Sequence, residues 1–503
     1  MRRILAFVMT MALFITLLMS CDNKQTESNV SDDSSTSTQS SEESGDKVYT
    51  ADVPDVNYNN LEFKIMTRLK ADAKYSEFGF WNEREANTIN TAVDKRNDKV
   101  EELLGIDIVE VGIIDGKDSS IGTQLRQIAN AGVDDYYFVE PQLYEVTTLA
   151  AEGLFYNLYD LEYLHALEAE WWDQYFLEET TIADKAFFVT GDVGFDTHQS
   201  LTVCYFNKDM IDEFDMENPY ELVKNHKWTL DVVIEWSKLV KTDLDNNNII
   251  NYKDKFGVGG QNDLMWALFY GNGCRLAEKD NNGIPVVNVY NDKSVSAMDK
   301  ILKLMNDKNY FVCANDYWGE SGYIVSPCEL ITDAFITNRA LFYYEALATA
   351  EDLRNADANM EFGILPIPLF DENQDEYQHM LNPWGGNAFA IPRYLGDEKA
   401  EIASIVLEVL GAESKNTVTP AVYDIALKQQ KTRDIESQEM LDLIFDTISV
   451  DVGHIYNWGN MGFSLLHAMI GADVGQFTSL WDGMEDSVNV AVDGTIEAFE
   501  ALD

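Results

Sequence analysis

Residues 61–67 read Leu-Glu-Phe-Lys-Ile-Met-Thr, a stretch in which apolar and polar side chains alternate. Alternation with a period of two predicts a β-strand, because successive side chains of a strand point to opposite faces. An amphipathic helical pattern follows over residues 90–104 and stops at Gly105, the residue type that most often closes a helix. The ordered part of the chain therefore begins with a strand followed by a helix.

The same succession continues after Gly105. Residues 106–111 predict a second strand, residues 121–131 a second helix, and residues 135–141 a short, almost wholly apolar strand. Apolar strands of this kind are typical of a sheet that helices cover on both faces. Strand, helix, strand, helix, strand is the order of a parallel α/β sheet, so the sequence predicts an α/β protein.

Short apolar segments maintain this pattern further along the chain. They lie at residues 186–190, 201–206, 340–344, 362–366 and 388–392. From Glu398 onward the pattern is almost entirely helical. We therefore expect a large α/β protein with a helical C-terminal region.

The chain begins with the pattern of an export signal. Two arginines precede the apolar residues 4–19, and the segment closes with Ser20-Cys21. A small residue followed by cysteine is similar to the lipobox of bacterial lipoproteins, so we expect a signal peptide over residues 1–20 and lipidation of Cys21. An uncleaved helical anchor is the alternative. Both place the rest of the chain outside the cytoplasm.

Residues 21–55 consist largely of serine, threonine and acidic or amide residues. Such a composition cannot offset the entropy cost of ordering, so this segment is predicted to be a flexible tether. A lipid and a tether together predict a protein at the extracellular face of the cell membrane. It would touch the membrane through the N-terminal lipid only.

The chain is strongly acidic, with 36 Lys and Arg against 87 Asp and Glu and a formal net charge of −51. Nucleic-acid binding requires clustered basic residues that neutralise phosphates, so this charge argues against a nucleic-acid partner. The five cysteines are too few for a disulfide framework in a chain of 503 residues. A bridge between Cys313 and Cys328 stays open, because sequence cannot fix pairing.

Catalytic sequence motifs do not stand out. The sequence contains no Gly-x-Ser-x-Gly elbow, no His-Glu-x-x-His pair and no Gly-x-x-x-x-Gly-Lys phosphate loop. Carboxylates that could act as acid and base are found throughout so acidic a chain, and their presence alone decides nothing. We expect a protein that is not an enzyme. A cell-surface enzyme acting on polysaccharide remains the alternative.

Four segments of the sequence, taken in order along the chain, resemble segments of one known protein family. They are Ala92-Val-Asp-Lys-Arg-Asn-Asp-Lys-Val-Glu-Glu; Phe206-Asn-Lys-Asp-Met with Asn218-Pro-Tyr-Glu-Leu-Val-Lys and Trp228-Thr-Leu-Asp; Arg339-Ala-Leu-Phe with Phe362-Gly-Ile-Leu-Pro-Ile-Pro; and Pro420-Ala-Val-Tyr-Asp-Ile-Ala-Leu-Lys. Together they resemble the extracellular solute-binding proteins of carbohydrate ABC transporters, the group that contains maltose-binding protein. The resemblance covers about residue 60 to the C-terminus.

The resemblance implies a two-lobe, periplasmic-binding-protein-like fold of type II with a ligand cleft between the lobes. We expect residues 56–192 and 346–392 to form the N-terminal lobe, and residues 193–345 and 393–503 to form the C-terminal lobe. A cleft spanned by hinges allows a ligand that touches both lobes to favour the closed state.

The resemblance also implies a function. The chain would be a monomer that captures a carbohydrate, in particular an oligosaccharide, and delivers it to the permease of an ABC importer. A peptide or another polar solute is the alternative cargo.

Sugars present apolar faces and hydroxyl edges, so a sugar site needs aromatic rings together with polar side chains. The loop positions of such residues, and the lobe crossings implied by the resemblance, lead us to predict eight ligand-binding residues. They are Arg68, Trp81, Asp192, Trp266, Tyr344, Glu345, Trp384 and Trp458. For the tryptophans, a ring that packs within the protein is the alternative.

Residues 243–254, Asp-Leu-Asp-Asn-Asn-Asn-Ile-Ile-Asn-Tyr-Lys-Asp, have the spacing of a twelve-residue calcium loop. The predicted ligands are the side chains of Asp243, Asp245, Asn247, Asn251 and Asp254 and the backbone carbonyl of Ile249. Asn248 stands where glycine is usual, and asparagine tolerates the left-handed backbone that this position needs. We predict a structural Ca²⁺ and no organic cofactor. A polar surface loop is the alternative.

Overall fold

The strand predicted at residues 61–67 is the central strand of a three-stranded parallel sheet, here called the first sheet. Its strands are β1 (Leu61–Leu69), β2 (Ile106–Ile114) and β3 (Tyr136–Glu140), in the order β2-β1-β3. The connections are α1 (Thr88–Leu104) and α2 (Ile121–Ala131). Gly105 closes α1 at φ 64°, in the left-handed conformation that glycine adopts most easily. The predicted parallel α/β start is confirmed.

These observations come from a computed structural model, which describes residues 47–70, 76–79, 87–320, 327–357, 359–428 and 435–502. The predicted signal peptide, the predicted lipidation site Cys21 and the predicted ligand residue Trp81 lie outside the described residues. From Val48 onward the chain forms one folded unit.

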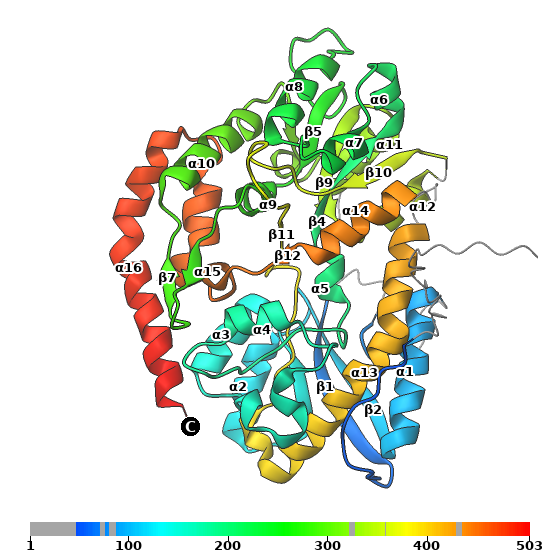
Figure 1. Cartoon of the computed structure of the whole chain (residues 1–503), viewed down its shortest axis with the longest axis vertical. Coiled ribbons are helices and arrows are strands. Elements are labelled where there is room, and N and C mark those ends of the chain that lie inside the picture. The colour runs from blue at the N-terminus through cyan, green and yellow to red at the C-terminus, as the bar shows by residue number, and fades with distance from the viewer. Residues whose placement is uncertain are drawn as a thin grey trace, which may run out of the picture. The chain divides into compact units, whose positions relative to one another are not determined.

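Helices cover both faces of the first sheet (Figure 1). On one face Phe63 and Ile65 of β1 join a core with α1 and the long helix α13 (Asp397–Lys428). On the other face Met66 and Val139 pack with α2 and α3 (Leu143–Ala151). Burial on both faces accounts for the apolar sequence of β3.

The second sheet has five strands in the order β10-β4-β9-β5-β8. They are β4 (Thr202–Asn207), β5 (Phe256–Gly260), β8 (Phe311–Cys313), β9 (Ala340–Ala346) and β10 (Phe362–Leu365). Strand β5 runs parallel to both of its neighbours, whereas β4 runs antiparallel to β9 and to β10. In Figure 1 this sheet lies above the first sheet.

Further helices and short strands surround the two sheets. The helices are α4 (Gln174–Thr180), α5 (Asp196–Gln199), α6 (Lys208–Glu213), α7 (Pro219–Lys224), α8 (Leu230–Val240), α9 (Leu264–Gly271), α10 (Asp292–Met305), α11 (Cys328–Ile336), α12 (Thr349–Ala356), α14 (Ile435–Asp446), α15 (Val452–Ile455) and α16 (Val474–Ala501). Two short pairs of strands are β6 (Ala277–Lys279) with β7 (Pro285–Val287), and β11 (His379–Met380) with β12 (Ile448–Ser449).

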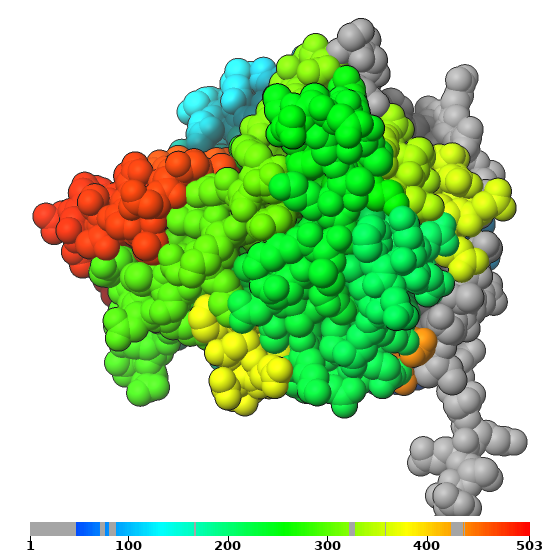
Figure 2. Space-filling view, turned by 90° about the horizontal axis from the view of Figure 1, so that it is seen from above, coloured from blue at the N-terminus to red at the C-terminus, as the bar shows by residue number. Residues whose placement is uncertain are grey.

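The C-terminal helix α16 contacts α10, which packs beside the second sheet, and α3, which packs on the first sheet. Its first turn meets Tyr290, which precedes α10, through Phe477 at a ring distance of 5.7 Å. Its last turn meets Phe187 through Phe499 at 4.8 Å, and Lys185 donates to the Phe499 carbonyl at 2.9 Å. Figure 2 shows α16 in red beside the light green of α10. The predicted helical C-terminal region is confirmed.

The elements that pack with each sheet do not follow the predicted lobe segments. Strand β10 lies within the predicted N-terminal segment 346–392, yet it pairs with β4 in the second sheet. Helix α13 lies within the predicted C-terminal segment 393–503, yet it packs on α1 of the first sheet. Which sheet a segment joins depends on contacts distant in sequence, and local periodicity carries no information about them.

The predicted tether also ends earlier than residue 55. Tyr49 exchanges two backbone hydrogen bonds with the Asn416 side chain of α13, each of 2.8 Å. Ala51 and Val53 pack against the core of the first sheet. Tyr49, Ala51 and Val53 alternate with more exposed residues here, so one side of this extended segment is partly buried. Among the described residues, no helix is both long and apolar enough to cross a membrane. Cys313 is a free thiol, so no bridge joins it to Cys328.

Candidate functional site

The carboxyl ends of β1, β2 and β3 border a cavity of about 290 Å³. Its lining includes Arg68 from β1, Asp115 directly after β2, and Gln142, Tyr144 and Glu145 at the start of α3. In open α/β sheets, ligands bind outside the carboxyl ends of the strands. This edge of the first sheet is therefore the candidate site.

Arg68 is held in place by the protein itself. Its Nε lies 3.0 Å from Asp115 Oδ2, and its Nη2 lies 2.7 Å from the same oxygen. Its Nη1 donates to the Trp384 carbonyl and to Asn387 Oδ1, both at 3.2 Å. Asn387 in turn donates to the buried Glu140 at 3.2 Å. All three guanidinium nitrogens therefore have protein partners.

The turn at residues 382–387 is fixed by its backbone. Gln142 donates to the Trp384 carbonyl at 2.7 Å, and the Trp384 N–H donates to Asn382 Oδ1 at 3.0 Å. A Cβ added at Gly385 would lie 2.7 Å from Ser200, so only glycine allows this approach. The Trp384 side chain nevertheless remains 55% exposed. A rigid backbone thus presents a large aromatic surface to solvent.

The second sheet also ends in polar residues. Gln261 follows β5 and donates to Glu345, near the end of β9, at 2.8 Å. Asn262 donates through its backbone N–H to Asn315, after β8, at 2.9 Å. Asp263 precedes α9, and its side chain makes no capping hydrogen bond with that helix. Amide and carboxylate groups are therefore concentrated at this edge as well.

Burial raises the pKa of Asp263 to about 7, and the nearby Glu345 carboxylate adds to this rise. Burial lowers the pKa of His467 to about 4. The imidazole is therefore neutral at pH 7, so its 3.6 Å approach to Asp263 is not an ion pair there. Both forms of the Asp263 carboxyl are populated near neutral pH.

Aromatic rings connect the edges of the two sheets. Phe463 lies in the π-helical turn Gly462–Leu466. Its ring centroid is 6.4 Å from that of Trp384, 6.1 Å from Tyr144 and 4.9 Å from Trp266. Trp384 and Tyr144 of α3 on one side and Trp266 of α9 on the other thus surround the Phe463 ring. An exposed indole beside amide and carboxylate groups suits a ligand with both apolar faces and hydroxyl groups.

The structure places the other predicted aromatic residues differently from Trp384. Trp266 and Tyr344 are buried, and the Trp266 Nε1 donates to the Gly462 carbonyl at 2.8 Å. Trp458 is also buried; its ring stacks on Tyr456 at 5.2 Å and its Nε1 donates to Thr495. In this conformation none of the three offers a ring face to solvent, which for Trp266 and Trp458 agrees with the alternative of rings packed within the protein.

Asp192 lies in a separate cavity of about 330 Å³ between α5, α13 and α14. Its carboxylate accepts hydrogen bonds from Lys415 at 3.0 Å and from Thr419 at 2.6 Å. Phe195 and Phe445 contribute apolar walls to this cavity. The structure therefore does not bring Asp192 together with Arg68 and Trp384.

Sequence reasoning missed Gln142, Asp263 and Phe463. Gln142 and Asp263 each follow a predicted or observed strand by two or three residues, so the rule of strand carboxyl ends would have found both. Phe463 carries no such signal, because its place depends on a π-helical turn far along the chain.

The predicted calcium loop has converging carboxylates. Ligand oxygens of Asp243, Asp245 and Asp254 lie within 4.8 Å of one another. The backbone N–H of Asn248 donates to Asp243 at 2.7 Å, and this bond chiefly lowers the pKa of the Asp243 carboxyl. Asn248 has φ 65°, which confirms the expected left-handed conformation. Ile250 of the loop is buried in a core that includes Phe256. These donor types fit Ca²⁺.

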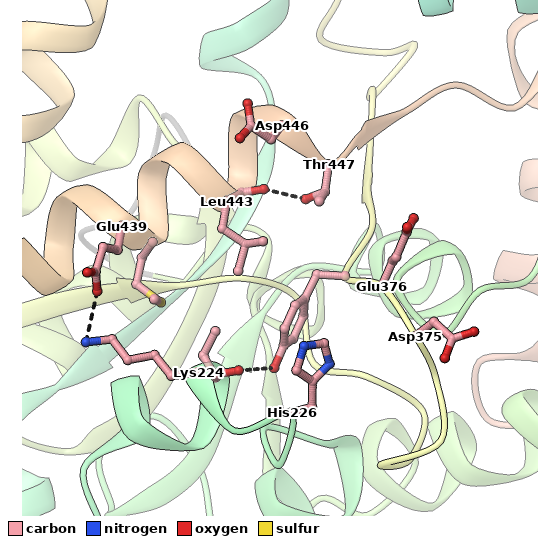
Figure 3. A pocket seen from close by; sticks show the side chains of 11 residues that line it. Lys224, His226, Asp375, Glu376, Glu439, Leu443, Asp446 and Thr447 are labelled. Carbon is pink, nitrogen blue, oxygen red and sulfur yellow. Dashed lines mark hydrogen bonds and ion pairs between the residues drawn. The ribbon is translucent and has the colours of Figure 1, made fainter. Parts of the chain in front are cut away.

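Figure 3 shows a further cavity, of about 600 Å³, beside the second sheet. It lies between α7, α14 and the segment around Tyr377. Tyr377 donates to the Val223 carbonyl at 3.3 Å, and Lys224 pairs with Glu439 at 2.9 Å. No residue predicted to bind ligand lines it.

No protein-family model and no curated protein matches the chain. Solved structures do resemble it. The ABC substrate-binding protein Lmo0181 from Listeria monocytogenes, in complex with cycloalternan, shares 12% identity over 88% of this chain and 99% of its own, with a TM-score of 0.51. UgpB from Mycobacterium tuberculosis, in complex with glycerophosphocholine, shares 14% over 86% and 99%, with a TM-score of 0.53.

A third similar structure is the maltose-binding periplasmic protein MalE from Listeria monocytogenes in complex with maltose. It shares 14% identity over 86% of this chain and 97% of its own, with a TM-score of 0.50. At these identities the likeness concerns the fold. The chain has the fold of ABC substrate-binding proteins, as the sequence resemblance implied.

Proposed function

We propose that this chain is an extracellular solute-binding protein that captures a carbohydrate and delivers it to the permease of an ABC importer. The observation that carries the proposal is the Trp384 turn. Its indole is 55% exposed although two side chains hold its carbonyl in place. Rigid, exposed aromatic surfaces beside polar groups are typical of binding sites.

Three further features support a binder of neutral polar solutes. Gln142 lies beside Trp384, and Asp263 and Glu345 lie at the edge of the second sheet, so both sheet edges offer hydrogen-bond groups for hydroxyls. The only described cation in the 290 Å³ cavity, Arg68, is already paired with Asp115. Two of the similar structures described above hold a carbohydrate, cycloalternan or maltose.

The location we propose is the outer face of the cell membrane, with lipid at Cys21 as the anchor. This rests on the N-terminal sequence pattern. Replacing Cys21 with alanine should release the protein into the medium of a bacterial host that processes lipoproteins. Cys328→Ala is the control and should leave it in the membrane fraction. Equal membrane retention of both variants would contradict a lipid anchor at Cys21.

A thermal-shift panel tests the function. A ligand that binds only the folded state stabilises it and so raises the melting temperature. At a ligand concentration of a hundred times Kd the stabilisation is about 2.7 kcal/mol. We expect a rise with at least one of maltose, maltotetraose, cycloalternan and other neutral oligosaccharides. No product should form during incubation, because we propose a binder and not a polysaccharide-cleaving enzyme.

A non-sugar solute is the second candidate, because UgpB, with the highest of the TM-scores given above, was solved with glycerophosphocholine. The same panel therefore includes glycerophosphocholine and short peptides. A response to these alone would replace carbohydrate by another polar solute. Silence across the panel would overturn the binding function.

We also propose that residues 243–254 bind Ca²⁺ as a structural ion. The convergence of Asp243, Asp245 and Asp254 supports this. The hydrogen bond from Asn248 favours the ionised form of Asp243, which is the form that binds a cation.

A further inference from the structure

Arg68 is the cation that a sugar site or an anion site would first be expected to use. Its side chain is only 10% exposed, and Asp115 occupies its Nε and Nη2. Its Nη1 is shared between the Trp384 carbonyl and Asn387. An arginine has five N–H donors in a rigid fork, so each of these bonds also fixes the direction of the others.

The Trp384 turn is held by the Arg68 guanidinium group and also by a second set of hydrogen bonds, from Gln142 and Ser200; together these bonds are here called the clamp. Gln142 donates to the same Trp384 carbonyl at 2.7 Å. The Ser200 hydroxyl lies 2.9 Å from the next carbonyl oxygen, of Gly385, and shares its hydrogen with the Asp196 carbonyl at 2.7 Å. Arg68 of β1, Gln142 directly before α3 and Ser200 directly after α5 therefore converge on two consecutive peptide groups, while the indole itself stays 55% exposed.

We propose that Arg68 is a positioning residue, which acts with Gln142 to hold the Trp384 indole in the orientation that receives the solute. Arg68 itself does not contact the solute. This inference rests on the proposed function, since it assumes that Trp384 is part of the binding surface. It also assigns Asp115 a role, because that carboxylate orients the guanidinium group toward Trp384. A site whose arginine is used in this way should not favour anionic sugars.

The first test needs no ligand. Tryptophan residues are labelled with 5-fluorotryptophan, and the ¹⁹F resonance of Trp384 is assigned by its loss in Trp384→Phe. In Arg68→Gln this resonance should shift or broaden, while those of buried Trp228 and Trp458 should not. Arg68→Lys should behave like Arg68→Gln, because one ammonium group cannot span both Asp115 and the Trp384 carbonyl.

Arg126→Gln is the matched control. Arg126 forms a comparable fork with Glu152, with two contacts of 2.7 Å, but has no bond to the Trp384 turn. Its replacement should leave the Trp384 resonance unchanged. Should Arg68→Gln fail to fold, Gln142→Ala decides the question, because Gln142 holds the same carbonyl from another element. An unchanged Trp384 resonance in the folded clamp variants would overturn the inference.

The second test is a double-mutant cycle with the sugar that gives the largest thermal shift in the panel. Arg68→Gln should weaken its binding about tenfold, the equivalent of 1.4 kcal/mol. In the Trp384→Ala background the same replacement should cost nothing further. Additive losses would mean that Arg68 touches the solute, against our inference. If no compound of the panel changes the melting temperature but the Trp384 resonance shifts in the clamp variants, the proposed function is contradicted and the positioning role of Arg68 is not.

Discussion

The hydroxyl of Tyr144 in α3 and Nε2 of His454 in α15 share a hydrogen bond that joins the first sheet's helical layer to the C-terminal segment. Burial lowers the pKa of His454 to about 3, so the imidazole is neutral and its Nε2 can accept. The Nδ1 atom lies 3.0 Å from Met380 Sδ. This bond lies next to Phe463, and therefore next to the candidate site.

Replacing Tyr144 with phenylalanine should destabilise the protein by about 1–3 kcal/mol, the cost of a buried polar group left without its partner. Urea unfolding measures the change. Tyr290→Phe is the control, because its hydroxyl pairs with Thr478 at an exposed position. That variant should stay within about 0.5 kcal/mol of the parent chain. Equal effects of the two replacements would show that the His454 bond contributes nothing.

Acidification should weaken the same region. The folded-state pKa of His454 lies below the ordinary histidine value of 6.5. Its contribution to stability is therefore present above pH 6.5 and is lost as the pH falls toward 3.

Glu77 should produce the opposite pH dependence. It is buried, and both its Oε1 bonds come from backbone N–H groups, of Phe195 and Asp196, at 2.9 Å. Burial, and then the Asp196 carboxylate, raise its pKa from 4.5 to about 8. The folded state thus binds a proton that the unfolded state releases. The contribution is complete below pH 4.5 and is lost as the pH rises through 8.

Glu77→Gln keeps an oxygen for the two N–H donors and removes the titration. We expect the variant to lose less stability than the parent chain between pH 5 and pH 8, measured by urea unfolding. Glu221→Gln, at an exposed position on α7, should follow the parent chain throughout. Parallel pH profiles for the parent chain and Glu77→Gln would refute the prediction.

The sequence predicted the elements better than their assembly. Alternation at 61–67 and the helical period at 90–104 identified β1 and α1 because each pattern arises within one element. The sheet that β10 joins depends on its pairing with β4, some 155 residues away, and no local pattern encodes that choice. For the same reason the predicted segments 346–392 and 393–503 each contain an element that packs with the other sheet, whereas the α/β class is confirmed.

The candidate site shows the same limit. Trp318, Trp384 and Trp458 each precede a glycine in a polar segment, so their local sequences are alike. The structure leaves Trp318 63% and Trp384 55% exposed, but buries Trp458 against α16. Whether each tryptophan is buried depends on residues far away in the sequence, such as Thr495 beside Trp458. The residues next to each tryptophan in the sequence carry no information about these contacts.

Calcium should stabilise the chain through the loop at residues 243–254. At a Ca²⁺ concentration of a hundred times Kd the gain is about 2.7 kcal/mol, visible as a higher Tm than in chelator. Asp243→Asn and Asp254→Asn should each reduce this gain, because each removes one of three carboxylates. Asp280→Asn is the control: Asp280 accepts similar backbone bonds in an exposed turn outside the cluster. A Tm that Ca²⁺ does not change in the parent chain would rule out the structural ion.

Trp384 and Trp458 should respond to replacement in opposite ways. Trp384→Ala removes a ring that is mostly in solvent, so the Tm of the ligand-free protein should change little. Its affinity for the best sugar of the panel should fall by about 2 kcal/mol or more, as at binding hot spots. Trp458→Ala removes a buried ring and its bond to Thr495, and should cost about 3–5 kcal/mol of stability.

Titration calorimetry with the panel sugar and urea unfolding separate the two effects. Trp458→Ala that still folds at low temperature should bind the sugar with nearly the parent affinity, because Trp458 offers no face to solvent. If Trp384→Ala binds the sugar with unchanged affinity, the exposed indole is not part of the binding surface. The carbohydrate site would then have to be sought among the polar groups around Asp263 and Glu345 instead.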